Sequence, residues 1–254
     1  MSQSIAVILS SAFSDFPRIS APMDVPTAHG TMPVFRFDRH DRPAYVMFRH
    51  GRPHGVMPQQ INYRAQAAAL RELGVGALLV TSSVGVLRAD VPLNTPLVVR
   101  DLLMPENRLP DGSQCTMFIE RSDDQAHLVL EHGLFDTEMN RQLTRLGAAD
   151  HRICFAYAPG PRTKTAAENR YWASLGGDVN SMTVGPEVVL ANELGIPTAA
   201  LVVGHKYSHP DIPNQDPSSL ESSLMDARAS FESLVVQWLE TASPVTFKNS
   251  LFRF

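Results

Sequence analysis

Apolar residues follow two patterns along this chain, and the two patterns alternate. Short runs rich in Val, Ile, Leu and Phe are typical of strands that are covered on both faces. We expect such strands at residues 5–9, 34–37, 44–48, 77–81, 96–103, 152–157 and 198–203. Apolar residues spaced three and four apart predict helices at residues 62–73, 138–146, 165–175, 186–193 and 218–242.

The connecting segments carry turn and loop signals. The proline-rich stretch that ends at Pro33 predicts an irregular connection, and the small residues 82–85 predict a tight turn. Residues 104–124 are expected to be largely loop. The tail 243–254 has no clear period, and packing on a neighbouring subunit is one hypothesis for it. The long helix has an apolar face made of Leu220, Leu224, Ala227, Phe231, Leu234 and Leu239.

Alternating strands and helices predict the fold class. Such a chain forms an α/β domain in which helices flank a central, mixed and largely parallel sheet. No repeat, charge block or low-complexity linker marks a boundary, so we expect one domain over residues 1–254.

Composition narrows the class of protein. The chain has 254 residues, of which 44% are hydrophobic and 19% charged, as is ordinary for a globular protein with a large core. Its net charge of −4 lacks the basic excess that binds a phosphodiester backbone, so nucleic acid is not an expected partner.

Cysteine usage and the N-terminal segment narrow the class of protein further. Cys115 and Cys154 form no CxxC pair, so they predict small buried side chains rather than a disulfide framework or a metal site. The first residues have neither the basic region nor the long apolar region of a signal peptide. No apolar run approaches the length of a membrane span. We therefore expect a cytoplasmic protein with no membrane partner.

Groups that bind anions follow several of the predicted strands. In open α/β sheets, ligands gather at the carboxyl ends of the strands. Hydroxyls, an arginine and a histidine occur at these ends, and oxyanions such as phosphate prefer such donors. Such residues include Ser10, Ser11, Arg49, His50, Thr81, Ser82, Ser83 and Thr183. Neither GxGxxG nor GxxxxGK[ST] is present, so a dinucleotide or a nucleoside triphosphate is not favoured.

Each of these residues also has a plainer interpretation. Arg49 and His50 alone would suit a surface pair, and Ser82 and Ser83 a simple turn. Thr183 alone suits the N-cap of the helix at 186–193. Met182 alone suits the core, and the pair at 205–206 suits an exposed loop. Their coincidence at strand ends is what favours a binding site.

Four motifs carry a resemblance to a known family. They are Arg49-His-Gly-Arg-Pro-His54 with Met57-Pro58 and Asn62-Tyr63-Arg-Ala65, then Thr81-Ser-Ser-Val-Gly-Val-Leu87, Gly160-Pro-Arg-Thr-Lys-Thr-Ala-Ala-Glu168 and Ser181-Met-Thr-Val-Gly-Pro-Glu-Val188. In order and spacing, from about residue 4 to about residue 240, the chain resembles the 5′-methylthioadenosine phosphorylases of the trimeric purine nucleoside phosphorylase family.

The resemblance implies phosphorolysis of a purine or purine-like nucleoside, with or without a 5′ substituent such as methylthio. Inorganic phosphate would be the co-substrate, and no metal or organic cofactor is implied. The matching motifs assign phosphate to Ser11, Arg49, His50, Ser82, Ser83 and Thr183, and the ribose to Met182. A homotrimer is implied, in which a neighbour completes each site, and His127 is a candidate for that contribution.

The base side of the implied pocket departs from the family pattern. The first strand ends in Ser10-Ser-Ala-Phe13 rather than in a glycine-rich loop, and Thr163 replaces the aromatic residue that stacks on the base. Lys164 replaces a glutamate found in members that bind 6-oxopurines. The run His205-Lys-Tyr-Ser208 replaces a carboxylate-rich segment of 6-aminopurine enzymes.

These replacements change the expected base. A lysine ammonium only donates hydrogen bonds, so the pocket favours a base with acceptors, or one that leaves as an anion, over adenine. His205 and Lys206 become the candidate catalytic residues, with His205 the candidate general acid, and Thr163, Lys164, Tyr207 and Ser208 are expected to line the base. The alternative is a repurposed relative that has lost catalysis and binds phosphate or another anionic ligand.

Overall fold

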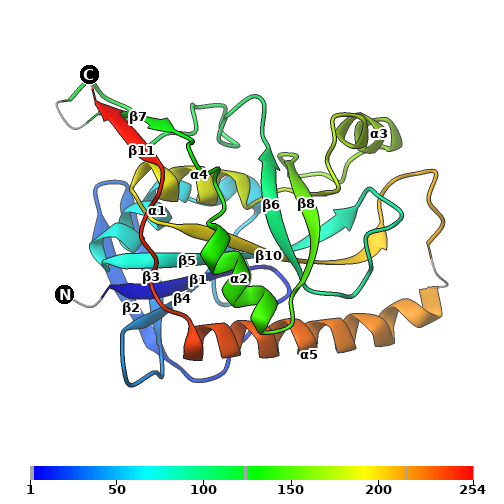
Figure 1. Ribbon diagram of the computed structural model, residues 1–254, viewed down its shortest axis with the longest axis horizontal. Helices are drawn as coiled ribbons and strands as arrows, with labels where there is room; N and C mark the ends of the chain where they lie inside the picture. The colour runs from blue at the N-terminus through cyan, green and yellow to red at the C-terminus, as the bar shows by residue number, and fades with distance from the viewer. Residues whose placement is uncertain (1–2, 123–124, 215–216, 254) are drawn as a thin grey trace.

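Nine strands form the central sheet of the computed structural model, which describes residues 3–122, 125–214 and 217–253, and the side chains of the long helix from residue 228 onward. The strands are β1 (Ser4–Leu9), β2 (Ile19–Thr27), β3 (Gly30–Phe37), β4 (Ala44–Phe48), β5 (Val75–Val86), β6 (Leu97–Leu103), β8 (Ala149–Tyr157), β9 (Val179–Ser181) and β10 (Thr198–Tyr207). Their order is β10-β6-β8-β9-β5-β1-β4-β3-β2 (Figure 1).

The sheet is mixed, and part of it closes on itself. The pairs β1–β4, β1–β5, β5–β10, β6–β8 and β8–β9 are parallel. Antiparallel pairs join β10 to β6 and β5 to β9. Because β10 also pairs with β5, these five strands form a ring. The predicted mixed α/β sheet is confirmed.

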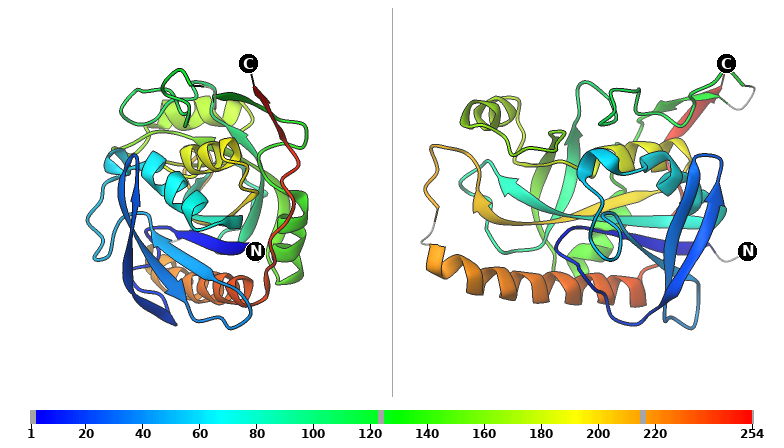
Figure 2. Two further views of the ribbon diagram at one scale, coloured as in Figure 1. Left: turned by 90° about the vertical axis from the view of Figure 1, so that its left-hand side faces the viewer. Right: turned by 180° about the vertical axis from the view of Figure 1, so that it is seen from behind.

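Helices cover both faces of the sheet. They are α1 (Tyr63–Glu72), α2 (Thr137–Arg145), α3 (Ala166–Ser174), α4 (Gly185–Glu193) and α5 (Pro217–Thr241). Side chains of β1 alternate between two cores, since Ile5 and Val7 pack with α5 and α2, and Ala6 packs with α1 and α4. Figure 1 shows α5 along one side of the sheet and α1 with α4 along the other, and Figure 2 shows the same layers from two further directions.

The helix predictions are confirmed within one or two residues at each end. Side chains of Phe231, Leu234 and Leu239 lie in the core as expected. Leu220, Leu224 and Ala227, the other members of that apolar face, lie outside the side chains that the structure describes.

Two strand predictions are corrected. The expected turn at 82–85 is wrong, because β5 continues to Val86 and pairs there with both β9 and β10. The strand expected at 198–203 extends to Tyr207, so residues 205–207 lie in the sheet rather than in a loop.

Four strands are absent from the sequence prediction. β2 lies in the proline-rich segment at the edge of the sheet, β9 has three residues, and β7 (Ala126–Val129) pairs with β11 (Ser250–Arg253) as a separate ribbon. The tail therefore pairs with residues 126–129 of its own chain. Asn249 supports this arrangement by donating from Nδ2 to the Gly133 carbonyl at 2.7 Å.

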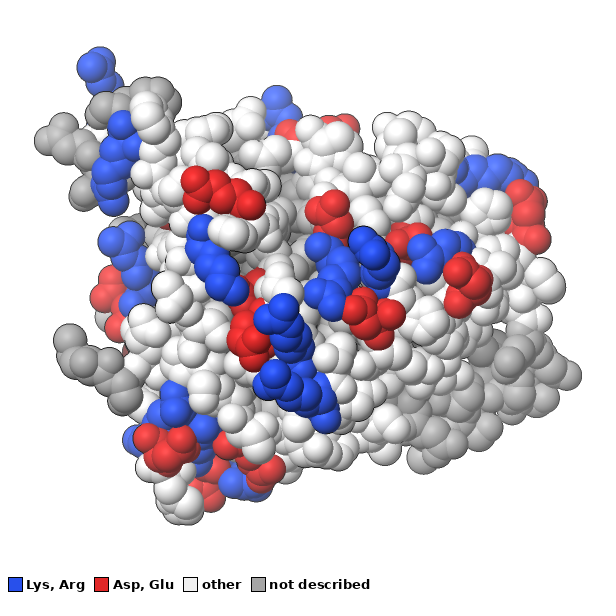
Figure 3. Space-filling model, in the orientation of Figure 1, with Lys and Arg blue, Asp and Glu red and all other residues white. Residues whose placement is uncertain are grey.

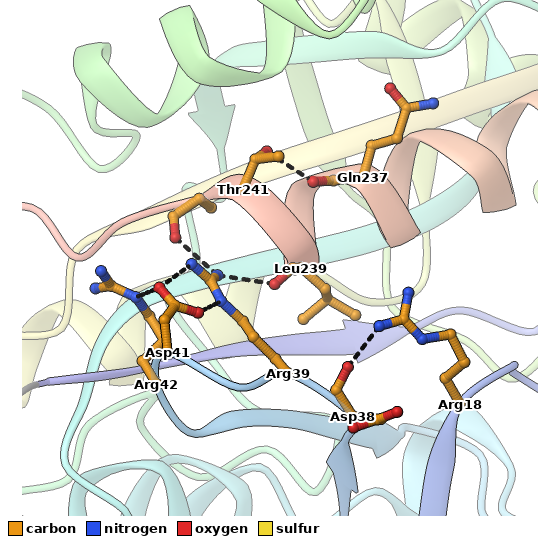
Figure 4. Close-up of polar contacts among 9 residues, drawn as sticks. Arg18, Asp38, Arg39, Asp41, Arg42, Gln237, Leu239 and Thr241 are labelled. Carbon is orange, nitrogen blue, oxygen red and sulfur yellow. Dashed lines mark hydrogen bonds and ion pairs between the residues drawn. The ribbon is translucent and has the colours of Figure 1, made fainter.

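Arg39, in the loop between β3 and β4, forms hydrogen bonds with the C-terminal end of α5. Its Nη1 donates to the carbonyls of Leu239 and Ala242 at 2.8 and 2.9 Å, and its Nη2 donates to Asp41 (Figure 4). The last carbonyls of a helix have no partner within it, and a cation there also complements the helix dipole. The helix that covers one face is thus fixed to the strands it covers.

The outer surface carries mixed charge. On the face in Figure 3, basic side chains lie next to acidic ones. One ion pair of the surface joins Arg141 and Glu138 on α2 at 3.1 Å. In the part of the chain that the structure describes, no helix is both long enough and apolar enough to cross a membrane. Of the two free cysteines, Cys115 is buried as expected, whereas Cys154 is half-buried.

Candidate functional site

One cavity of about 650 Å³ collects every predicted site residue. The two candidate catalytic residues, the six phosphate candidates and the five other substrate candidates all line it. They are Ser11, Arg49, His50, Ser82, Ser83, Thr163, Lys164, Met182, Thr183, His205, Lys206, Tyr207 and Ser208. His127 does not line this cavity within the chain; it is exposed on β7, opposite Phe252.

Parallel pairing explains this convergence. Leu9 at the end of β1 pairs with Phe48 at the end of β4, so the segments that follow them leave the sheet at the same edge. Ser82 on β5 pairs with Val202 on β10. The carboxyl ends of four parallel strands thus meet in one place, where ligands of α/β sheets bind.

Thr81 joins three of the converging segments. Its Oγ1 accepts from the Ser10 amide at 2.9 Å and donates to the Ile8 carbonyl at 3.0 Å. Its own carbonyl accepts from Arg49 Nη1 at 2.9 Å. These contacts are buried, so they hold the turn with Ser10 and Ser11, β5 and the arginine in one fixed arrangement.

Glu187 holds the guanidinium of Arg49. Arg49 Nε and Nη2 donate to the two carboxylate oxygens of Glu187, each at 2.6 Å. The two side chains are 1% and 0% exposed, so this bidentate pair is fully removed from solvent. The charge of Arg49 is therefore balanced within the protein, and its orientation is set before any ligand arrives.

Thr183 is presented by a strained turn rather than by an N-cap. Val184 has φ 74° and ψ −54°, and the Gly185 amide donates to the Thr183 carbonyl at 3.0 Å. This geometry is a γ-turn, which is costly for a β-branched residue. The N-cap of α4 is Val184, so the plainer interpretation of Thr183 is wrong. Glu187 Oε2 also accepts from the Val184 amide at 3.0 Å, so one carboxylate fixes both the turn and Arg49.

His50 is buried beside Arg49 and keeps one ring nitrogen occupied. Its Nδ1 lies 2.8 Å from the Val56 carbonyl, which accepts, so Nδ1 carries the proton and Nε2 has a free lone pair. Burial lowers the pKa of His50 to about 4, and the charge of Arg49 adds to this lowering. The imidazole is therefore neutral near pH 7.

A β-bulge lies at the far end of β10. The pairing of β10 with β5 runs from Gly204↔Val84 to Lys206↔Gly85, so His205 is an extra residue. A bulge changes the direction of a strand's side chains, which otherwise alternate between faces. This explains how the four consecutive residues His205, Lys206, Tyr207 and Ser208 all line one cavity.

Two lysines lie near each other on this side of the cavity. Burial is the main cause that lowers the pKa of Lys164, and the nearby charge of Lys206 contributes further. Burial and then Lys206 likewise lower the pKa of His205. Thr163 is exposed at the rim, so this position offers no stacking surface.

Sequence reasoning missed three side chains that shape the site. Glu187 was visible only as part of a motif, with nothing to show that it pairs with Arg49. Asn169 on α3 and Asn180 on β9 also line the cavity, and Asn180 Nδ2 donates to Asn169 Oδ1 at 2.9 Å. Each asparagine lies directly beside a motif, Asn169 after Glu168 and Asn180 before Ser181, and only the fold brings them together.

The fold and the cavity define the class of protein. Residues 4–237 match the phosphorylase superfamily, and the chain belongs to this family. The match covers the strands and helices that build the cavity. It confirms the resemblance seen in the motifs and the prediction of an enzyme.

Particular relatives carry more specific names. The chain is 34% identical over 186 residues to a probable S-methyl-5′-thioinosine phosphorylase of Methanopyrus kandleri, a match that covers 72% of this chain and 70% of the relative. It is 30% identical over 217 residues to a 6-oxopurine nucleoside phosphorylase of Pyrococcus furiosus, covering 80% and 79%.

Solved structures share the fold. A methylthioadenosine phosphorylase of Schistosoma mansoni, in complex with adenine, superposes with a TM-score of 0.79. The match covers 93% of this chain and 90% of that one, at 20% sequence identity. At that identity the likeness establishes the architecture alone.

Proposed function

We propose that this protein catalyses the phosphorolysis of a purine nucleoside to the free base and ribose 1-phosphate, with inorganic phosphate as co-substrate. One observation carries the proposal: the six phosphate candidates, drawn from strand ends and turns far apart in the sequence, line a single cavity in a member of the phosphorylase superfamily. The relatives named above are phosphorylases, and none supports a family member without catalysis.

Phosphate is bound by neutral donors and one fixed arginine. Ser83 and Thr183 offer hydroxyls, and Arg49 offers its N–H groups that Glu187 and Thr81 leave unused. The hydroxyl of Ser82 donates to the Ser83 carbonyl at 3.0 Å and would have to turn toward the phosphate. Neutral His50 presents the Nε2 lone pair, which suits the P–OH of hydrogen phosphate. Preorganised donors of this kind hold the nucleophile and stabilise the cationic sugar in the transition state.

The reaction balances without a redox step. A phosphate oxygen forms a bond to C1′, the bond from C1′ to the base breaks, and the electron pair stays on the base. A proton delivered to the departing base makes it a better leaving group. The lowered pKa of His205 favours its neutral form, which donates a hydrogen bond, and Lys206 lies beside it.

The base is a 6-oxopurine or a similar base rich in acceptors. Lys164 and Lys206 offer hydrogen-bond donors only, which suits O6 and N7 better than an amino group. Two relatives named for 6-oxopurine or thioinosine substrates are consistent with this choice. Met182 contacts the ribose, and a 5′-methylthio group is an alternative to the 5′-hydroxyl.

The assembly is proposed to be a homotrimer, as the resemblance implies. Ile119 in the 104–124 loop and Tyr171 on α3 are each 53% exposed, so a neighbouring subunit has apolar surface to cover there. A second copy would cover them and bring residues such as His127 toward a neighbour's cavity. Light scattering after size exclusion measures the mass directly.

The test is ribose 1-phosphate formation from phosphate and a panel of inosine, guanosine, adenosine and the 5′-methylthio forms. We expect turnover of at least one 6-oxopurine nucleoside and little of adenosine. Arg49→Ala should abolish it, and Ser83→Ala should raise the KM for phosphate without breaking the ion pair. Arg71→Ala on the exposed face of α1 is the matched control.

No turnover of any nucleoside would contradict the proposal. If phosphate still raised the melting temperature of such an inactive protein, the cavity would be an anion-binding site without catalysis. If neither turnover nor stabilisation occurred, the assignment of the six phosphate candidates would also be wrong.

A further inference from the structure

The chain uses lysine sparingly and concentrates it in the cavity. Of its 22 basic residues other than histidine, three are lysines and 19 are arginines. Lys164 and Lys206 line the cavity, and Lys248 lies elsewhere, paired with Asp136 at 3.1 Å. A lysine ammonium is a compact charge that can give up its proton, which a guanidinium does not do. The two cavity lysines therefore mark a place where a titratable cation matters.

The positive charge of these lysines has no carboxylate beside it in the cavity. None of the described residues that line the cavity is Asp or Glu. Arg49 differs, because the carboxylate of Glu187 forms an ion pair with it and balances its charge. Glu168, which interacts with Lys164, is itself engaged by Arg162 at 2.7 and 2.8 Å. The uncompensated charge of the cavity thus lies at Lys164 and Lys206, not at the phosphate candidates.

Lys206 lies further along the sheet than the phosphate candidates on β5. Lys206 pairs with Gly85, which is two residues beyond Ser83 and three beyond Ser82 on β5. At about 3.3 Å per residue this is roughly 7–10 Å along the strand. A phosphate held at Ser82 and Ser83 would therefore leave Lys206, and Lys164 that interacts with it, toward the other end of a bound nucleoside.

We propose that Lys164 and Lys206 select a nucleoside whose base carries a negative charge at neutral pH, of the class of the 2,6-dioxopurines, whose acidic imide ionises. The inference rests on the proposed phosphorolysis and adds the charge of the base to it. Two ammonium groups without a carboxylate are matched by an anion, whereas a neutral 6-oxopurine would leave one of them uncompensated.

The same lysines prevent a second negative charge from building up on the departing base. When phosphate displaces an anionic base, the C1′–N9 electron pair would leave the purine with two negative charges. An ammonium proton transferred to N7 keeps the product a monoanion, and the resulting neutral amine regains its proton from water. Burial lowers the pKa of Lys164, which makes its ammonium proton easier to transfer.

The experiment compares kcat/KM for xanthosine and inosine between pH 5.5 and 8, with phosphate saturating. We expect the ratio of xanthosine to inosine to rise with pH as the imide ionises and to exceed tenfold at pH 7.5. Lys164→Met and Lys206→Met should each lower that ratio by at least tenfold. Lys248→Met, which removes the third lysine outside the cavity, should leave the ratio within twofold.

Each other outcome has a defined meaning. A ratio that stays flat with pH, with inosine turned over, would overturn the inference and leave the proposed function standing. An increase in the KM for phosphate alone in Lys206→Met would place the lysines on phosphate instead. A preference for inosine 5′-monophosphate over both nucleosides would place the anion on the sugar. Failure of all nucleosides to react would refute the phosphorolysis itself.

Discussion

Replacing Glu187 tests whether the buried ion pair positions the phosphate arginine. Glu187→Gln keeps the shape of the side chain but removes its charge, so Arg49 is left buried without a counter-ion. Both hydrogen bonds of the pair are 2.6 Å long and both side chains are essentially unexposed. Breaking such a pair from one side costs about 3–5 kcal/mol, a large share of the stability of a typical domain.

The paired replacement Arg49→Met with Glu187→Leu separates stability from binding. An apolar pair of similar volume leaves no buried charge, so we expect it to recover most of the stability that Glu187→Gln loses. The same variant lacks the charged donor for phosphate and should bind phosphate roughly ten- to hundredfold more weakly. Glu138→Gln, on the exposed face of α2, is the matched single control.

Urea unfolding followed by circular dichroism measures the first effect, and calorimetric titration with phosphate measures the second. Two results would refute the reasoning. One is a loss of less than about 1 kcal/mol in Glu187→Gln, which would mean that the arginine finds water or another partner. The other is normal phosphate affinity in the doubly apolar variant, which would remove Arg49 from the binding site.

Three further predictions follow from single contacts. Because burial lowers the pKa of His50 to about 4 from 6.5, the unfolded chain binds a proton in this interval that the folded chain does not. The free energy of unfolding should therefore rise from pH 4 to 6.5, and urea midpoints of His50→Asn should show a shallower rise. Gly85→Ala places a Cβ onto the Ser208 hydroxyl and 2.9 Å from its Cβ, so it should cost about 1–3 kcal/mol and weaken nucleoside binding. Gly55→Ala, where the nearest atom is 3.8 Å away, should do neither in the same melting and titration assays. Thr81→Val removes the side-chain partner of two buried main-chain groups and should lower stability by about 2–3 kcal/mol, with a raised KM for phosphate; an unchanged KM would mean that the turn needs no such anchor.

The sequence predicted the helices and central strands well because their apolar periodicity is local. It failed at β2, where Pro22 and Pro26 argue against a strand, yet both lie at the sheet edge, where a missing amide is tolerated. It failed at residues 82–85 because the small residues that suggest a turn are held extended by strands on both sides.

In the candidate site, too, some residues were predicted from the sequence and some contacts were not. Motif residues such as Thr183 and Lys164 were found, because each is recognisable by type and order along the chain. The pairing of Arg49 with Glu187 spans 138 positions, and no local pattern encodes it. The bulge at His205 depends on the register between two strands, which is set by the whole sheet.

Because of the bulge at His205, the side chains that face the base depend on the number of residues in β10 as well as on their chemistry. Removing His205 would restore regular pairing, because Gly204 and Lys206 already pair with the successive residues Val84 and Gly85. Lys206 and Tyr207 would keep their partners on β5, and the cavity would lose one lining side chain. A single codon insertion or deletion at this position therefore adds or removes one side chain of the cavity without changing the strand pairing, and alignments that place no gap here will compare residues that do not face the same atoms.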